Sequence, residues 1–473
     1  MNKIQNLALK TFGESPVNVT PLVQSGSDRQ YFRIRFRNKS SVIAAVNPHI
    51  RENRVFYKMT KYFGEKGLPV PELFAVSEDE TTCLLQDLGD ETLLDHVLKH
   101  RENDEIHPES LAYYRQALEE LAAMQTSAGD YDYRYTWPVP EFDRQAVIWD
   151  LNYFKYYYAK LAGAPFDEKA LQDDFEKLAD FLMSAPSDYF MFRDFQSRNI
   201  MIHNKQVWFI DYQGGRKGAL QYDVASLLYQ ARAKLPESVR DELLKHYLSV
   251  LSHHIDVDKN AFLNYYQGFV LIRVLQTLGA YGFRGLYEQK SHFILSLPMA
   301  IENLHTIRHQ HDVLSRFPEL ASLVDALLDE KYQPFAGENT EQKDKLQVTI
   351  SSFSYKKGLP RDYSGHGGGH VFDCRAIHNP GRYEKYKTLT GKDKPVIDFL
   401  DQTEEMTTFL EHVKAIVAAS VETYQRRGFD HLSVSFGCTG GQHRSVYAAE
   451  KLAASLKNKY SVNLVIRHRE QNM

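Results

Sequence analysis

The stretch that decides the fold runs from residue 190 to residue 215 and reads FMFRDFQSRNIMIHNKQVWFIDYQGG. Within it Asp194 lies five positions before Asn199, and two short β-rich runs with a polar turn between them lead on to Asp211. Because a β-hairpin returns the chain, we expect Asp211 to lie beside Asn199. Phosphoryl transfer needs few protein groups, namely a carboxylate near the acceptor hydroxyl and oxygen ligands for magnesium. The spacing therefore predicts Asp194 as the catalytic base and Asn199 and Asp211 as magnesium ligands.

The alternative for these residues is that each forms only local hydrogen bonds in a turn, as Asp and Asn commonly do. Their joint occurrence around a hairpin, with YDVASLLYQ following at residues 222–230, favours a kinase-like geometry. In that later stretch we predict a structural role for Asp223, as a buried carboxylate that accepts backbone N–H bonds from the loop around Asp194.

Strand and helix patterns on either side indicate a two-lobed α+β protein. Residues 29–46 read as short strands, residues 52–67 have helical spacing that ends in glycine, and residues 81–93 read as an apolar strand followed by a Gly-Asp turn. Helical patterns dominate the next part of the chain. The predicted boundaries are 1–90 for a small antiparallel β lobe and 91–330 for a large helical lobe.

A polar stretch without periodicity, EKYQPFAGENTEQKDKLQ at residues 330–347, follows these lobes and predicts a linker over residues 331–345. Residues 346–473 then form a second, small α/β domain. This domain carries 18 Lys and Arg residues against 13 Asp and Glu, whereas the whole chain has a formal net charge of −4. A basic domain on an acidic body favours an anionic partner, although scattered solvated side chains would give the same excess.

The second domain contains VSFGCTGGQHRSVYAAEKL at residues 434–452, an apolar strand that runs into a glycine-rich turn and then a helix. Such a turn directs the amides of residues 439–445 and the positive end of the helix at one site, which suits an anion. Arg444 can add a bidentate grip on phosphate, and His443 and Thr439 can donate further bonds. The predicted anion-binding residues are Cys438, Thr439, Gly440, Gly441, Gln442, His443, Arg444 and Ser445.

The same loop fits the pattern C-x5-R-S from Cys438 to Ser445, which is the signature of tyrosine phosphatases. A cradle of amides would lower the pKa of the thiol and make it a nucleophilic thiolate. No motif places the general-acid aspartate that such an enzyme needs, and Asp373 is only a candidate. We therefore predict that the loop binds an anion, with phosphatase chemistry as the alternative.

The chain has three cysteines, Cys83, Cys374 and Cys438, and this odd, scattered set gives no disulfide framework. No uncharged apolar run reaches the roughly 20 residues needed to span a bilayer, since the best candidate is interrupted by Arg273. The first residues show no sustained apolar segment of a signal peptide. We therefore expect a cytoplasmic protein that does not enter a membrane.

The motifs FRDFQSRN, FIDYQ and YDVASLL together resemble the aminoglycoside phosphotransferase and choline kinase group of the protein-kinase-like fold. Three further segments are QSGSDRQYFRI, LLQDLGDETL and RVLQTLGAYGFRG. They are similar to segments of the anomeric kinases that phosphorylate N-acetylmuramate and N-acetylglucosamine. The resemblance covers roughly residues 10–330 and implies ATP and magnesium as cofactors. It places Ser25, Gly26, Ser27 and Arg29 in the turn over the ATP phosphates, and Gln86, Asp87 and Leu88 in the hinge that meets adenine.

Two positions depart from the pattern of that group. Phe192 stands where most such kinases have a histidine that packs and orients the loop. The run SSVIAAVNP at residues 40–48 has no lysine where the third strand should place one against the phosphates. Glu52 on the following helix would then lack its usual partner, and Lys39, Arg33 or Arg35 could substitute only from another position. A pseudokinase is therefore an alternative.

Five segments of this domain occur in a fixed order: TISSFSYKKGLP, HVFDCRAIHNPGRY, TGKDKPVIDFLD, the strand-turn-helix described above and VIRHRE. Together they resemble the C-terminal domain of RapZ proteins. The resemblance spans nearly all of residues 346–473. It implies a site for a sugar phosphate such as glucosamine-6-phosphate, and RNA or regulatory proteins as further partners. Gly381 and Arg382 stand in place of the family's His-Trp pair, although an arginine still suits an anion.

These features lead to one preferred function and one alternative. The preferred function is an ATP- and magnesium-dependent small-molecule phosphotransferase with an alcohol group as acceptor, namely a kinase of an amino sugar or cell-wall sugar. Its C-terminal domain would bind a related sugar phosphate. The alternative is a catalytically poor kinase fold that couples a sugar-phosphate signal to a protein or RNA partner.

Overall fold

The computed structural model describes residues 2–22, 29–103, 105–333, 345–360 and 368–471. The chain divides into two compact units, the first formed by residues 1–283 and 296–334 and the second by residues 284–295 and 335–473. Most of the predicted linker at 331–345 lies outside the described residues. Within the described ranges, no helix combines the length and apolar character needed to cross a membrane.

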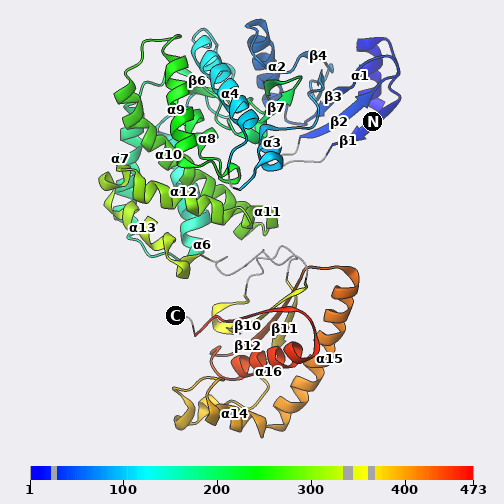
Figure 1. Cartoon of the computed structure of the whole chain (residues 1–473), viewed down its shortest axis with the longest axis vertical. Coiled ribbons are helices and arrows are strands. Elements are labelled where there is room, and N and C mark those ends of the chain that lie inside the picture. The colour runs from blue at the N-terminus through cyan, green and yellow to red at the C-terminus, as the bar shows by residue number, and fades with distance from the viewer. Residues whose placement is uncertain (1, 23–28, 104, 334–344, 361–367, 472–473) are drawn as a thin grey trace. The chain divides into compact units, whose positions relative to one another are not determined.

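The first unit begins with a five-stranded antiparallel sheet in the order β1-β2-β3-β5-β4 (Figure 1). Its strands are β1 (Asn18–Pro21), β2 (Gln30–Arg35), β3 (Val42–Val46), β4 (Leu73–Val76) and β5 (Thr82–Gln86). The register of β3 on β5 places Ala45 opposite Cys83. The predicted β lobe is thus present, with β5 leading directly toward the helical lobe.

Two helices pack against this sheet, α1 (Asn2–Phe12) and α2 (Ile50–Glu65). The buried face of α1 presents Ile4 and Ala8 to a core that includes Ile34 of β2 and Leu84 of β5. The first turn of α2 contains Glu52, which is the position that the sequence pattern assigns to the glutamate of a kinase-like lobe.

The helical part of the first unit is built around α10 (Lys259–Tyr281), which packs against α5, α7, α8 and α12. Because α10 is covered on most sides, its sequence is apolar almost all round. The α-helices of this part are α3 (Leu93–His100), α4 (Pro108–Ser127), α5 (Arg144–Phe154), α6 (Lys160–Ala162), α7 (Glu168–Met183), α8 (Gln221–Leu228), α9 (Glu237–Leu251), α10, α12 (Leu297–Gln310) and α13 (Pro318–Leu328).

Short 3-10 and π-helical turns join these helices. The 3-10 turns are η1 (Tyr133–Tyr135), η3 (Ser197–Asn199), η4 (Ala231–Ala233), η6 (Val313–Arg316) and η7 (Glu330–Tyr332), and the π-helical turns are η2 (Lys155–Ala159) and η5 (Gly282–Tyr287). Gly282 permits a close approach here, because a Cβ at this position would lie 2.1 Å from the Tyr157 carbonyl oxygen. Helix α11 (Ser291–Ile294) falls in the residues assigned to the second unit.

Two small antiparallel ladders interrupt the helices, and the opening stretch predicts the first of them. Strand β7 (Ile200–His203) pairs with β8 (Gln206–Phe209), and β6 (Tyr189–Met191) pairs with β9 (Arg216–Gly218). The second ladder joins the two ends of the stretch around residues 190–215. The loop with Asp194 and the residue Asp211 are therefore both held between paired strands.

The second unit contains a four-stranded sheet in the order β11-β12-β10-β13, and all of its strand pairs are parallel. Its strands are β10 (Gln347–Ser354), β11 (His370–Asp373), β12 (His431–Cys438) and β13 (Asn463–His468). Its helices are α14 (Lys394–Asp401), α15 (Glu404–Arg427) and α16 (Arg444–Lys459), and its 3-10 turns are η8 (Tyr355–Lys357), η9 (Pro380–Arg382) and η10 (Glu384–Tyr386).

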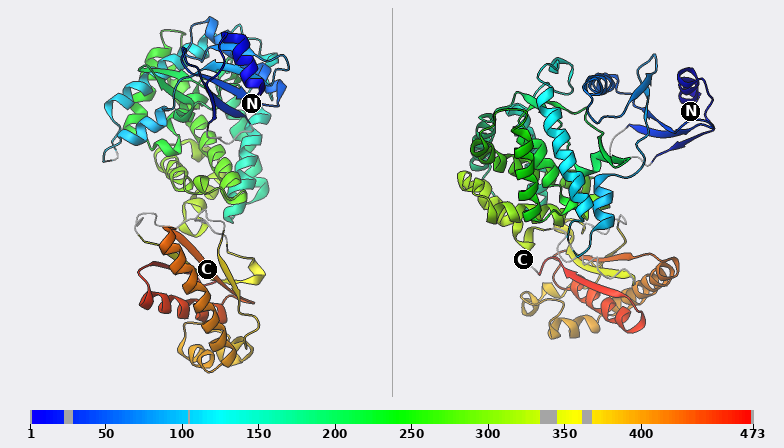
Figure 2. Two further views of the ribbon diagram at one scale, coloured as in Figure 1. Left: turned by 90° about the vertical axis from the view of Figure 1, so that its right-hand side faces the viewer. Right: turned by 45° about the horizontal axis from the view of Figure 1, so that its top comes forward.

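One face of this sheet forms a core with α15 and α16, which Figure 2 shows lying against the strands. Ile350, Val434 and Phe436 of the sheet join Val417 and Leu452 of the helices in this core. Because the strands are parallel, their carboxyl ends meet at one edge, which is where α/β sheets place their ligands. The predicted fold class, a kinase-like pair of lobes followed by a small α/β domain, is confirmed.

Candidate functional site

The three residues predicted to act in phosphoryl transfer lie together. The Asn199 side-chain amide donates a hydrogen bond to the Asp194 carbonyl oxygen (2.9 Å) and lies 3.4 Å from Asp211 Oδ2. The β7–β8 hairpin produces this contact, because it returns the chain from Asn199 to Asp211 as the sequence spacing predicts. The Asp194 side chain is 44% exposed and therefore accessible to an acceptor.

Asp211 has a backbone conformation and an electrostatic setting that suit a cation ligand. Its φ of +68° lies in the left-handed region, which is uncommon for a residue other than glycine and occurs often at functional sites. The Asp211 side chain is exposed, but the protein atoms packed around its carboxyl and the negative charge of Asp194 raise its pKa. Gln213, Arg198 and Arg29 act against this rise. A cation between the two carboxylates would remove their repulsion.

The donor set at this place fits magnesium better than a metal held by protein alone. Among the described residues, no cluster of three or more His, Cys, Asp or Glu side chains could hold a metal ion. Magnesium needs no such cluster, because it keeps several waters and is usually held by one or two carboxylates plus substrate phosphates. Asn199 and Asp211 supply oxygen donors of the required kind.

The loop around Asp194 is supported from below by Asp223, which confirms the predicted structural role. The Asp223 carboxylate accepts hydrogen bonds from the amides of Phe192 (2.7 Å) and Arg193 (2.9 Å) and from the Gln125 side chain (3.1 Å). Complete burial raises the pKa of Asp223 to about 7, although these hydrogen bonds favour its ionised form. The carboxylate therefore holds the loop by its two main-chain bonds.

Phe192, the residue in place of the usual histidine, packs into an aromatic cluster below the loop. Its ring centroid lies 5.2 Å from that of Phe195 and 6.1 Å from those of Phe209 and Tyr212, in edge-to-face geometry. The side chain is fully buried. Aromatic packing thus fixes the loop at the position where most such kinases have a histidine.

The structure corrects the expectation that Glu52 lacks a partner. Arg29 Nη2 lies 2.8 Å from Glu52 Oε1, and only 4% of Arg29 is exposed. Its guanidinium also lies 5.1 Å from the centroid of the Phe56 ring. Arg29 lies just before β2, whereas the family pattern places the cation in β3. A search for a lysine in the third strand therefore cannot detect this pair.

Two of the other cations considered for this role, Arg33 and Lys39, are engaged elsewhere. Arg33 forms an ion pair with Asp87 (2.7 Å) and a second one with Asp90 (2.8 Å). The Lys39 ammonium lies 4.6 Å from the centroid of the Phe12 ring. Arg29 is therefore the cation that the structure pairs with Glu52.

The predicted nucleotide-binding residues are described only in part. Ser25, Gly26 and Ser27 lie outside the described residues. Gln86 ends β5, and Leu88 is buried two residues later. The Asp87 carboxylate accepts bonds from Arg33, from the Ser41 hydroxyl (2.6 Å) and from the Gly89 amide (3.0 Å), so its side chain fixes the segment. The nucleotide contacts expected for residues 86–88 stay a prediction.

Arg273 is a residue of this site that sequence reasoning missed. It lies on α10, is 4% exposed, and has Nη2 at 3.6 Å from Asp194 Oδ1. In the sequence it is the charge that interrupts an apolar run and the first residue of RVLQTLGAYGFRG, and neither feature assigned it to the site. That interruption was the signal, because a charge inside an apolar helix needs a buried partner.

In the second unit the predicted anion loop follows β12 and ends where α16 begins at Arg444. The Cys438 thiol is buried, accepts a bond from the Gly441 amide (3.2 Å) and lies 3.1 Å from the Ser445 hydroxyl oxygen. Gly441 has a φ of +68°, whereas Thr439 and Gly440 form the exposed rim of the loop. The thiol thus lies at the base of the loop.

The side chains of residues 442–444 hold the loop in place. Gln442 Nε2 donates to the carbonyls of Lys387 (3.0 Å) and Leu389 (2.7 Å), and His443 Nε2 lies 2.8 Å from the Tyr386 carbonyl oxygen. These residues therefore use their polar atoms within the protein. The anion contacts predicted for them stay a prediction.

Arg444 combines an internal role with an unused donor. Its Nη1 donates to the carbonyls of Arg375 (3.0 Å) and Ile377 (2.7 Å). Within the described residues its buried Nε has no hydrogen-bond partner. In the described part of the chain the Nε atoms of Arg29 and Arg240 are also buried without a partner, so this donor does not by itself mark an anion site.

The RHRE segment serves mainly to fix this edge of the sheet. His468 lies 2.8 Å from the Ser352 hydroxyl and 2.9 Å from Glu450 Oε1, and Arg469 donates to the Gly358 carbonyl (2.9 Å). Glu470 accepts a bond from the Ser354 amide (3.2 Å). These two basic side chains are therefore engaged with the protein itself.

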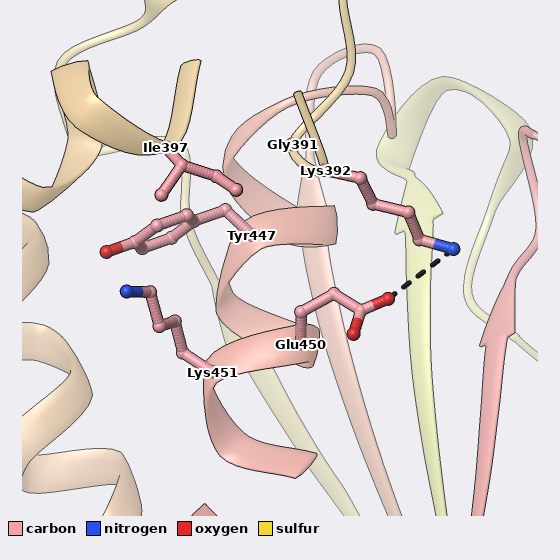
Figure 3. Close-up of a pocket in the computed structure, with 6 residues that line it drawn as sticks. All are labelled: Gly391, Lys392, Ile397, Tyr447, Glu450 and Lys451. Carbon is pink, nitrogen blue, oxygen red and sulfur yellow. Dashed lines mark ion pairs between the residues drawn. The ribbon is translucent and has the colours of Figure 1, made fainter. Parts of the chain in front are cut away.

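A hollow of about 300 Å³ lies on the same unit beside α16 (Figure 3). It is lined by Gly391, Lys392, Ile397, Tyr447, Glu450 and Lys451. Lys392 pairs with Glu450 (3.4 Å) and Lys451 with Asp401 (2.7 Å), so both lining lysines already have carboxylate partners. The hollow is thus less suited to an anion than the loop at 438–445.

Together, the two lobes and the Asp-Asn-Asp loop define a kinase-like chain. Residues 19–257 match the family described as the phosphotransferase enzyme family, and residues 346–472 match the RapZ C-terminal domain. The first match covers half of the chain. The chain belongs to the phosphotransferase enzyme family and carries a RapZ C-terminal domain fused to it.

Individual relatives cover parts of the chain. A nucleotide-binding protein of Paraburkholderia xenovorans (strain LB400) is 40% identical over 131 residues, which is 28% of this chain and 42% of that protein. The choline kinase LicA from Streptococcus pneumoniae is 13% identical with a TM-score of 0.41 and covers 64% of this chain and 98% of its own. An amicoumacin kinase is 14% identical with a TM-score of 0.46, at 65% and 92% coverage. The chain spans less than two thirds of the length of the curated relatives it matches first.

Proposed function

We propose that the first unit is an ATP- and magnesium-dependent kinase that phosphorylates an alcohol group of an amino sugar or cell-wall sugar. The observation that carries this proposal is the contact of Asn199 with both Asp194 and Asp211. Asp194 orients the acceptor hydroxyl and takes its proton as the bond to phosphorus forms. Asn199 and Asp211 hold magnesium, which neutralises charge on the phosphates.

In this proposal Arg29 replaces the lysine that the third strand lacks. It is buried, it is fixed by Glu52 and Phe56, and its charge acts on the pKa of Asp211. An arginine fork suits phosphate at least as well as a lysine. With Ser25, Gly26 and Ser27 it would face the ATP phosphates, while the main chain of residues 86–88 would meet adenine.

An aromatic cluster near the end of α10 supports a sugar as the acceptor. The Tyr157 ring centroid lies 5.0 Å from that of Tyr153 and 4.8 Å from that of Phe283, and all three rings are half-buried. Half-buried rings offer an apolar face with polar groups at the edge, as ligand pockets commonly do. The cluster lies where α10 meets the π-helical turn η2, and π-helical turns are frequent at functional sites.

For the second unit, we propose a site for a sugar phosphate such as glucosamine-6-phosphate at residues 438–445. The N-terminus of α16 provides a positive dipole, and among the described residues the amides of Gly440 and Gln442 have no backbone acceptor. Arg444 adds positive charge at the first residue of that helix. RNA or a regulatory protein would be a further partner of this unit.

The kinase proposal is tested with the purified chain, ATP, magnesium and a panel of acceptors. The expected result is phosphoryl transfer to an amino sugar that is abolished by Asp194→Asn, while nucleotide binding persists. Failure with amino sugars, choline and aminoglycosides alike would contradict the proposal. Nucleotide binding without any transfer, together with sugar-phosphate binding, would favour the alternative of a regulatory pseudokinase.

A further inference from the structure

Arg193 has an uncommon backbone conformation for a residue that carries a side chain. Its φ of +79° lies in the left-handed region, which is unfavourable for any residue with a Cβ and is adopted mainly by glycine. Asp194, the proposed catalytic base, follows it directly in the chain. Such conformations persist only where surrounding contacts impose them, and they cluster at functional sites. The contacts of Arg193 therefore tell what holds the chain just before the base.

The main chain on both sides of the Arg193 Cα is held by hydrogen bonds. The Asp223 carboxylate accepts bonds from the amides of Phe192 (2.7 Å) and Arg193 (2.9 Å). After the base, the Asn199 side-chain amide donates to the Asp194 carbonyl oxygen (2.9 Å). These bonds do not by themselves fix the rotation about the N–Cα bond of Arg193. That rotation decides in which direction the chain leads on to Asp194.

The side chain of Arg193 is fixed at a second place. Its Nη2 donates to Asp150 Oδ1 on α5 (2.7 Å), and its Nη1 donates to the Tyr222 hydroxyl on α8 (2.6 Å). The guanidinium carbon also lies 5.0 Å from the ring centroids of both Phe142 and Tyr222. Only 15% of the Arg193 side chain and 11% of the Asp150 side chain are exposed. Solvent and salt therefore screen this ion pair little.

The two attachments of Arg193 together determine its φ. The amide lies at one end of the N–Cα bond and the side chain leaves from the other end, so holding both groups restricts the rotation between them. A change of φ would break the bond to Asp223 or the pair with Asp150. Helix α5 in turn packs against α10, from which Arg273 Nη2 approaches Asp194 Oδ1 (3.6 Å). The same pair of helices thus supports the backbone before the base and the carboxylate of the base.

We propose that Arg193 is a positioning residue for Asp194, because its pair with Asp150 keeps the preceding backbone left-handed and so directs the Asp194 carboxylate at the acceptor hydroxyl. This inference rests on the proposed kinase function and adds to it the residues that set the geometry of the base. In this role Arg193 acts on the backbone and makes no contact with the reacting atoms. A residue that adopts the left-handed conformation without support should therefore replace it, and glycine is that residue.

The test compares Arg193→Gly with Arg193→Ala. Both variants remove the guanidinium and leave Asp150 without its partner, but only glycine accepts a φ near +79° without a steric penalty. Alanine should release the loop and lower kcat by about tenfold to a hundredfold, whereas glycine should keep kcat at least about tenfold above that of the alanine variant. The KM for ATP should change by less than about twofold in both variants, because only the base is displaced.

A control pair and a second background assign the effect to Arg193. Lys234 also has a left-handed φ, of +42°, and is exposed elsewhere in the same unit, so Lys234→Gly and Lys234→Ala should both keep the native kcat. If the variants at residue 193 are too unstable to purify, both are combined with Asp150→Asn, which removes the unpaired carboxylate. Equal kcat in the glycine and alanine variants would overturn the inference while the kinase function stands.

A structural measurement separates this inference from the kinase proposal. If the native chain phosphorylates no acceptor, the kinase function fails, and crystal structures of the native chain and the two variants at residue 193 then test the positioning directly. The glycine variant should keep the left-handed φ and the native place of Asp194. The alanine variant should leave the left-handed region and displace the Asp194 carboxylate. An alanine variant with the native φ and an undisplaced Asp194 would contradict the inference.

Discussion

The loop at 190–215 in the first unit and the loop at 438–445 in the second unit use their polar side chains in opposite ways. In the first, Asp194 and Asp211 are open to solvent, while the buried carboxylate of Asp223 holds the main chain. In the second, His443 and Arg444 bond to neighbouring carbonyls, and exposed main-chain groups form the rim. Chemistry needs free side chains, whereas an anion can be held by amides once side chains have fixed the loop.

The largest predicted effect on activity comes from the loss of an exposed carboxylate in the loop at 190–215. Asp211→Asn removes the charge of a predicted magnesium ligand and should lower kcat by about a hundredfold or more. The measurement is phosphoryl transfer over a series of magnesium concentrations. Asp188→Asn, at an exposed carboxylate that pairs with Lys217 outside the site, is the matched control. Equal rates in Asp211→Asn and the native chain would remove Asp211 from the mechanism.

The next prediction concerns Asp223, the buried carboxylate below the loop at 190–215, and its effect on the free energy of unfolding. Its folded pKa of about 7 lies above the ordinary aspartate value of about 3.9, so between these values the folded protein keeps a proton that the unfolded chain has released. The free energy of unfolding should therefore fall as pH rises from about 4 to about 7, by up to about 1.4 kcal/mol per pH unit from Asp223.

Tryptophan fluorescence can measure this pH dependence, because Trp137, Trp149 and Trp208 all lie in the first unit. Denaturant unfolding is followed from pH 4.5 to 7.5 in the native chain and in Asp223→Asn. The variant should be less stable, since Asn replaces one acceptor oxygen, but its stability should fall less steeply with pH. Parallel curves for the two proteins would show that Asp223 is already ionised at pH 4.5.

A smaller effect is expected from the cation that replaces the missing lysine. Arg29→Ala should reduce kcat/KM for ATP by about tenfold to hundredfold, because it removes a charged donor and frees Glu52. Arg29→Lys should recover part of the loss, since the charge returns without the fork. If Arg29→Ala keeps native kinetics, another residue meets the phosphates and the pair with Glu52 is only structural.

The smallest predicted effect tests the second loop. Arg444→Ala should weaken glucosamine-6-phosphate binding about tenfold by calorimetry, because one charged donor is lost while the amides remain. Arg469→Ala is a matched control, since this arginine also bonds to backbone carbonyls at the same sheet edge. A similar loss in both variants would indicate general damage to the edge rather than a contact with the anion.

The same contrast explains what the sequence could predict. The hairpin, the approach of Asn199 to Asp211 and the burial of Asp223 all follow from local spacing, and the structure confirms them. The pairing of Arg29 with Glu52 and the approach of Arg273 to Asp194 join elements that are distant in sequence, so no local pattern reports them.

The second loop shows a different limit of sequence reasoning. Its strand, turn and helix were predictable from glycine and apolar spacing. The bonds of Gln442, His443 and Arg444 to the carbonyls of residues 375–389 were not, because a side chain's partner depends on how a separate segment packs beside it.

Gln213 links the two lobes of the kinase fold through one side chain. Its amide nitrogen lies 2.9 Å from Asp211 Oδ1 and 3.4 Å from Glu52 Oε1 on α2. The Thr60 hydroxyl on the same helix lies 2.6 Å from the Tyr212 hydroxyl, and this second contact is buried. Helix α2 is therefore tied to both residues that follow Asp211, so the positions of Glu52 and Asp211 are set by one shared group of contacts.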